Sequence, residues 1–222
     1  MSLAEPLRSS SDQQGPEPAV SPNNPCPFLR ALVAGGYVPG HIEALGSLSH
    51  TIVTASDDRP SDPPVSGALA YVIAMVANGL GPGRILENIQ HGVQLDGLRG
   101  GPLDKRGAGS RILDVLARID ETELARLDDF ASDKVDAAGV VERGLGSEQI
   151  KTMMDANFAR AAGHRRAIDR ILMTGEWPVL LKVIGKPSAE GRYLSLAEVR
   201  TLFVDRRLPD RIVARLQAMK PA

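Results

Sequence analysis

The sequence predicts an all-α protein, a single domain built from many short helices. Apolar residues recur at helical spacing of three and four through most of the chain. Strand-like alternation is scarce, and residues 179–184 are the only segment that competes as a strand. A length of 222 residues fits one domain with a tail.

The first 24 residues are predicted to form a disordered tail, because prolines interrupt a polar stretch with almost nothing to bury. The helical domain is predicted to cover residues 25–218. A second break is expected at 57–64, where the chain is polar and rich in proline. No convincing internal repeat is evident.

Seven helical stripes are predicted in chain order. The first stops at Gly35 and Gly36, and the third at Asn78 and Gly79, since glycine is a frequent helix stop. The last follows Ser195 and Glu198, which have capping-box spacing. The stripes cover 28–33, 42–53, 65–76, 85–89, 124–130, 150–158 and 199–203. The segment 98–111 has no apolar period, and its glycines favour a functional loop.

Composition limits the class of partner. Lys plus Arg number 26 and Asp plus Glu 27, a net charge of −1, so no nucleic-acid partner is expected. No apolar run of 18 residues occurs, so no membrane partner is expected. The one cysteine excludes an internal disulfide and suits a reducing compartment, and residues 1–7 lack a signal-peptide pattern. A cytoplasmic location is predicted.

Cys26 is the strongest candidate site residue. It lies between Pro25 and Pro27, directly before a helical stripe, and proline is common at the first helical position. The free N–H groups of the first turn would point toward the sulfur and, with the helix dipole, favour a thiolate. A thiolate held this way is a nucleophile or a metal ligand. The alternative is that Cys26 is a small apolar residue in a turn.

Residues 25–39 resemble the signature of the haem-thiolate peroxidases, the family of fungal chloroperoxidase and unspecific peroxygenase. That signature contains Pro-Cys-Pro and, at a set distance, Gly-Tyr. The positions that fit it are Pro25, Cys26, Pro27, Leu29, Ala31, Leu32, Gly36, Tyr37 and Pro39. The C-terminal part is similar too, with Gly175-Glu176, an apolar run to Gly185, and Arg207-Leu208-Pro209.

The resemblance implies a helical fold around a haem-sized cavity that holds haem b. Cys26 would be the axial ligand of the iron, with Phe28 and Leu29 also binding the cofactor and His91 on the distal side. The expected partners are a peroxide and a small apolar or aromatic compound that the peroxide oxidises. Mg²⁺ or Mn²⁺ near a haem propionate is a further expectation. The oligomeric state stays open.

The family's distal Glu-His-Asp motif is absent from this chain. One register places Asp104 where the acid–base glutamate of the family stands, and a rival register leaves only Asp120 or Glu121 nearby. Asp104 also fits a solvated charged turn. The alternative function is therefore a haem-binding or haem-free protein of the same fold that has lost peroxide chemistry, such as a sensor, carrier or interaction domain.

Overall fold

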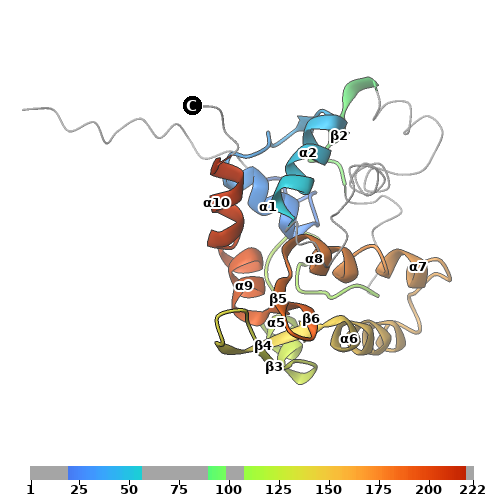
Figure 1. Cartoon of the computed structure of the whole chain (residues 1–222). Coiled ribbons are helices and arrows are strands. Elements are labelled where there is room, and N and C mark those ends of the chain that lie inside the picture. Colours follow the sequence, from blue (N-terminus) through green and yellow to red (C-terminus); the bar gives the residue numbers. More distant parts are fainter. Residues whose placement is uncertain (1–19, 57–89, 99–107, 219–222) are drawn as a thin grey trace, which may run out of the picture.

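Helices alternate with short antiparallel strands in the computed structural model, which describes residues 20–56, 90–98 and 108–218 (Figure 1). In chain order the elements are α1 (Pro27–Ala34), β1 (Ile42–Glu43), α2 (Leu45–Ala55), β2 (Val93–Gln94), α5 (Glu121–Ala125), the 3₁₀ helix η1 (Arg126–Asp129), β3 (Ser132–Val135), β4 (Val141–Gly146), α6 (Ser147–Arg160), α7 (Asp169–Met173), α8 (Trp177–Ile184), β5 (Lys186–Ser188), β6 (Gly191–Ser195), α9 (Leu196–Arg200), the π-helical turn η2 (Thr201–Asp205) and α10 (Asp210–Ala218).

The all-α prediction is wrong, because the described residues form two antiparallel sheets as well as helices. One sheet pairs β1 with β2, and the other has the strand order β3-β4-β6-β5. The segment 179–184, the expected competitor as a strand, lies in helix α8 instead. The sequence pattern did not predict these strands, because each is too short to show a clear alternation of apolar and polar residues.

The four-stranded sheet is built from two hairpins that meet at its centre. β3 pairs with β4 and β5 with β6, and the two hairpins join where Leu145 stands opposite Leu194. An isolated bridge between Asp136 and Ser188 also brings the first hairpin to β5. The sheet therefore joins the hairpin at 132–146 to the hairpin at 186–195.

Each hairpin leads directly into a helix, and the two units repeat one another. Gly146 caps α6 and its N–H donates to Oε1 of Gln149 at 3.1 Å. Ser195 caps α9, and its Oγ accepts the N–H of Glu198 at 3.5 Å. These are the two halves of a capping box at equivalent positions. The two hairpins are thus each followed by a helix that begins at the end of the second strand.

Most predicted helices within the described residues are present because their local signals agree with the tertiary packing. Pro27 begins α1, and the helix ends before Gly35 and Gly36, the latter with φ of +66°. Ser147 begins α6, and the predicted capping box precedes α9. The stripe at 42–53 is helical only from Leu45, since Ile42 pairs with Gln94 in a strand. The predicted helices at 65–76 and 85–89 lie outside the described residues, as do residues 1–19 of the tail.

The core joins the helices to the sheet. α10 packs against α2, and α8 packs against α2, α6 and β6 (Figure 1). Trp177 of α8 stacks on Phe203 of η2, with ring centroids 6.1 Å apart. Leu32 and Leu48 are fully buried, and they fill the space between the helices. The described helices thus pack on one another and on a sheet, which corrects the expected arrangement of helices alone.

Within the described parts of the chain, no helix has both the length and the apolar character needed to cross a lipid bilayer.

The turn between β3 and β4 requires a residue without a side chain. Gly139 has φ of +82°, whereas Gly163 has an ordinary φ, and a Cβ would meet no atom within 4 Å at either position. We expect Gly139→Ala to lower the free energy of unfolding by about 1 kcal/mol, since a left-handed backbone disfavours alanine. The matched control, Gly163→Ala, should leave stability unchanged or slightly higher. Urea unfolding followed by Trp177 fluorescence measures both; equal stability of the two variants would contradict the expectation.

Candidate functional site

Cys26 occupies the N-cap of α1, as the sequence predicted. Its backbone is extended, with φ of −83° and ψ of 113°. Its N–H donates to Asn24 Oδ1 at 3.1 Å, and its carbonyl oxygen accepts the N–H of Arg30 at 3.0 Å. The side chain is half-buried and packs against the hydrophobic core. Cys26 thus stands at the start of a helix, with part of the residue exposed.

A buried arginine supports the turn that carries Cys26. Arg30 is only 3% exposed, and its Nη1 donates to the carbonyl oxygens of Ser21 at 3.0 Å and Asn24 at 3.3 Å. Asn24 is itself buried. Because these bonds join residues on both sides of Cys26, they restrict the backbone that positions the sulfur.

The other predicted site residues lie in different surroundings. Phe28 and Leu29 are buried in the core. His91 is exposed. Glu121 is also exposed, and its Oε2 accepts Arg200 Nη1 at 2.8 Å. Figure 1 shows α5 near the four-stranded sheet in the lower part of the molecule and α1 in the upper part. Asp104 lies outside the described residues.

The acidic residue of the rival register has a structural role. Oδ1 of Asp120 accepts the N–H groups of Thr122 at 3.0 Å and Glu123 at 3.1 Å, which caps α5. Arg126, in the same register, donates to Asn157 Oδ1 at 2.8 Å. Asp120 thus caps its own helix, and Arg126 binds η1 to α6.

A haem needs an axial donor and an apolar slot beside it. Cys26 supplies a candidate donor at the N-cap of α1, where its side chain makes no capping hydrogen bond to the first helical turn. Phe28 and Leu29, however, pack into the core and leave no slot of their own. Within the described ranges, no three His, Cys, Asp or Glu side chains lie together as a metal site. The expected site for Mg²⁺ or Mn²⁺ is therefore not present among the described residues.

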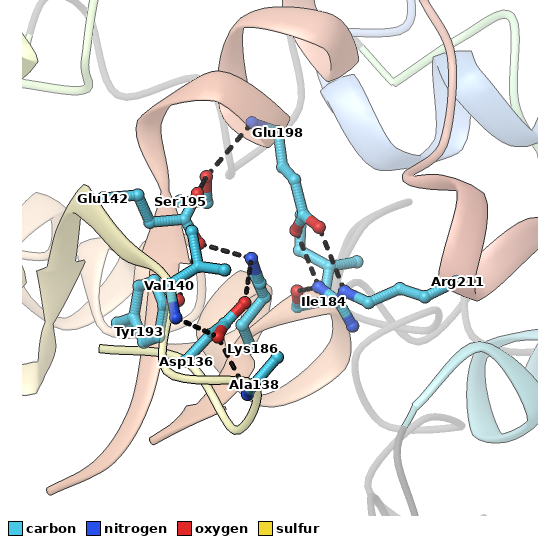
Figure 2. Close-up of polar contacts among 10 residues, drawn as sticks. All are labelled: Asp136, Ala138, Val140, Glu142, Ile184, Lys186, Tyr193, Ser195, Glu198 and Arg211. Atoms are coloured by element: carbon cyan, nitrogen blue, oxygen red, sulfur yellow. Dashed lines mark hydrogen bonds and ion pairs between the residues drawn. The ribbon is translucent and has the colours of Figure 1, made fainter. Parts of the chain in front are cut away.

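The most connected polar group in the described residues lies elsewhere, around Glu142 of β4 (Figure 2). Glu142 Oε1 accepts the phenol of Tyr193 at 2.6 Å and the ammonium of Lys186, and Oε2 accepts the hydroxyl of Ser195 at 2.6 Å. Lys186 also lies 3.4 Å from Asp136 Oδ2. We call these five residues the Glu142 cluster.

The charges of the Glu142 cluster are stabilised against titration near neutral pH. Partial burial acts to raise the pKa of Glu142, but hydrogen bonds from Lys186, Ser195 and Tyr193 outweigh it, so the pKa lies below its usual range. Burial and the Glu142 carboxylate both raise the pKa of Tyr193. The pKa of Lys186 is raised because the carboxylate of Glu142 outweighs the opposing effect of burial. With Glu142 ionised, Tyr193 neutral and Lys186 charged, none of them is poised for proton transfer at pH 7.

The Glu142 cluster therefore stabilises the fold: it joins β4, β5 and β6. Next to it, Arg211 of α10 binds Glu198 through Nε at 3.0 Å and Nη2 at 2.7 Å, and also donates to the carbonyl oxygen of Ile184 (Figure 2). Sequence reasoning missed the cluster because the partners of Glu142 are 44, 51 and 53 residues away along the chain. The sequence did contain a signal for the two hairpins. Their turns begin with Asp136 and Ser188 and contain Gly139 and Gly191, which have a left-handed backbone.

Comparison of the chain with models of known protein families, with curated proteins and with solved structures finds no match in any of the three.

The pKa shifts in the Glu142 cluster predict a stability plateau near neutral pH. Tyr193 keeps its proton in the folded protein where the unfolded chain loses it, so the free energy of unfolding should fall as pH rises above about 10. Glu142 stays ionised where the unfolded chain is protonated, so stability should also fall as pH drops below about 4. Urea unfolding at pH 3.5, 7 and 10.5 measures both declines.

Tyr193→Phe should cost about 2 kcal/mol at pH 7, because it removes a buried hydrogen bond to a charged acceptor. It should also flatten the alkaline decline. Arg118→Ala is the control: it breaks an ion pair with Asp114 in which Arg118 is 74% exposed, and should change stability by less than about 0.5 kcal/mol. A Tyr193→Phe protein as stable as the wild type would show that the phenol contributes nothing.

Proposed function

We propose that the chain is a haem-thiolate protein of the peroxidase or peroxygenase type, in which Cys26 is the axial ligand of haem iron. The expected substrates are a peroxide and a small apolar or aromatic compound. A reducing compartment such as the cytoplasm is part of the proposal, because a single cysteine must stay a thiol to serve as a ligand.

The observation that carries the proposal is the position of Cys26. Its sulfur lies at the start of α1, half-buried, in a turn held by Asn24 and Arg30. The segment around it has nine positions in common with the haem-thiolate signature. A partly buried cysteine at a helix N-cap, in a turn held by hydrogen bonds, supports the assignment of an axial thiolate.

A haem bound to a thiolate supplies cleavage of the O–O bond of a peroxide. The contribution of the chain itself is to fix the backbone turn that carries the sulfur. Asn24 fixes the amide of Cys26, and the buried guanidinium of Arg30 holds Ser21 and Asn24 against α1. A carboxylate near the distal face would move the proton of the peroxide, and Asp104 is proposed for this role.

The second candidate is a haem-binding or haem-free protein without peroxide chemistry. It is favoured by Glu121, whose carboxylate pairs with Arg200 and is not placed at Cys26. It is also favoured by Phe28 and Leu29, which pack in the core.

An absorption spectrum of purified protein supplied with haem tests the axial ligand. The reduced, CO-bound wild type should show a Soret band shifted far to the red, as thiolate ligation gives, and Cys26→Ala should lose this shift while keeping its far-UV circular dichroism. His164→Ala is the matched control and should keep the band. If the band survives in folded Cys26→Ala, the sulfur is not the ligand; if the wild type binds no haem, the haem-free candidate holds.

The acid–base assignment is tested by the rate of peroxide consumption. Asp104→Asn should retain haem yet slow consumption by about 10²-fold or more, the usual contribution of a positioned proton donor. Glu121→Gln should leave the rate unchanged, because Glu121 is paired with Arg200 at the surface. The reverse result would move the role to Glu121.

A further inference from the structure

Two large apolar side chains are exposed where the chain enters α7. Ile168 is 49% exposed and Ile171 is 70% exposed. Ile168 is the N-cap of α7 and has a helical backbone, so residues three apart here lie on the same face. Adjacent exposed apolar side chains are less usual than scattered ones and indicate a contact surface. We call these two isoleucines, with the neighbouring Arg165 and Arg170, the α7 patch.

The turn between α6 and α7, which leads to the α7 patch, is fixed by internal contacts. Asp169 is completely buried, and its carboxylate accepts the backbone N–H of Arg166 at 2.7 Å and the Nε–H of the same residue at 2.8 Å. Arg165 Nη1 donates to the carbonyl oxygen of Phe158 at 2.6 Å. A surface that is already ordered loses little conformational entropy when it binds a partner.

Positive charge exceeds negative charge beside the two isoleucines. The guanidinium carbons of Arg165 and Arg170 lie 4.1 and 5.7 Å from the centroid of the Phe158 ring, so the two cations are neighbours. Asp155 is shared between Arg170 and Lys151. Within the part of the chain that the structure describes, Arg165 pairs with no carboxylate and instead contacts Phe158. The α7 patch therefore combines exposed apolar groups with uncompensated positive charge.

We propose that the α7 patch binds the surface of an anionic phospholipid bilayer. Ile168 and Ile171 enter the boundary between headgroups and acyl chains, and the guanidiniums of Arg165 and Arg170 bind lipid phosphates. Binding at a bilayer surface needs no spanning helix, so it is compatible with a sequence that has no apolar run of 18 residues. It goes beyond the proposed haem chemistry and does not depend on Cys26.

The size and the charge of the α7 patch favour a bilayer over a protein partner. Two partly exposed isoleucines offer far less apolar area than the roughly 1,000 Å² that a stable protein interface buries. Shallow insertion into a bilayer needs less area, because anionic lipids also attract the cations. A second copy of the chain that packed on the same patch would bring Arg165 and Arg170 against like charges.

Co-sedimentation of the full chain with lipid vesicles tests the proposal. Vesicles of phosphatidylserine and phosphatidylcholine in equal parts should bind it about tenfold or more tightly than vesicles of phosphatidylcholine alone, because only the former attract the arginines. Ile171→Ser should weaken binding to the anionic vesicles about fivefold or more, since it removes the more exposed apolar side chain. Arg165→Gln should weaken it about fivefold, the usual effect of one cation at an anionic surface. Arg165→Lys keeps the charge and should restore most of the binding.

The matched controls lie on elements that Figure 1 shows well away from α7. Val141→Ser removes a 63% exposed valine of β4, one of another group of exposed apolar residues with Val135 and Val140. Arg200→Gln removes an exposed cation of α9. Both variants should bind the anionic vesicles like the wild type, and so should Cys26→Ala, which separates this inference from the haem proposal.

Equal affinity for the two kinds of vesicle, or binding to neither, would overturn the proposal. Wild-type binding in Ile171→Ser would do the same, as would a loss in Val141→Ser as large as the loss in Ile171→Ser. Sedimentation velocity of the lipid-free protein tests whether a second copy occupies the α7 patch. A dimer that Ile171→Ser dissociates would assign the patch to self-association and overturn the lipid assignment.

Discussion

The Glu142 carboxylate holds the four-stranded sheet together, and the rest of the described fold depends on that sheet. Three donors from two other strands meet at its oxygens: Lys186 of β5, and Tyr193 and Ser195 of β6. Because a half-buried carboxylate must be compensated by hydrogen bonds, this position selects its partners strongly. Ser195 also caps α9, so the same contact sets where that helix begins. The link continues through Glu198 to Arg211 on α10, which packs against α2.

Local signals in the sequence were enough to predict several helices but not the sheet. α1 and α9 carry their own start signals, Pro27 and the Ser195–Glu198 pair, so a window of a few residues suffices. The strands β5 and β6 are three and five residues long, and their identity depends on partners in another hairpin. No local pattern records that Leu145 will stand opposite Leu194. Short strands in a mostly helical chain are therefore read as loops or helix ends.

The residues of the candidate site also differ in whether neighbouring sequence is enough to predict their surroundings. The position of Cys26 at the start of a helix follows from the residues next to it, and the structure confirms it. The fate of Glu121 follows from Arg200, 79 residues later, and no local pattern shows that the two will pair. Arg30 is the more instructive case, because charged residues are seldom buried alone. Its burial is explained by carbonyl oxygens of Ser21 and Asn24, which only the folded turn presents to it.

The bridge between Asp136 and Ser188 brings the first hairpin against the outermost strand on the other side of the sheet. In an open sheet, the two outer strands would each present unpaired backbone groups to neighbouring molecules, and such rows are templates for aggregation. In this protein, the bridge between Asp136 and Ser188 satisfies some of these backbone groups within the same chain. Lys134 and Lys186 lie on the outer strands, where they pair with Glu190 and Glu142. The bridge therefore leaves fewer unpaired backbone groups at the ends of the outer strands than an open four-stranded sheet would present.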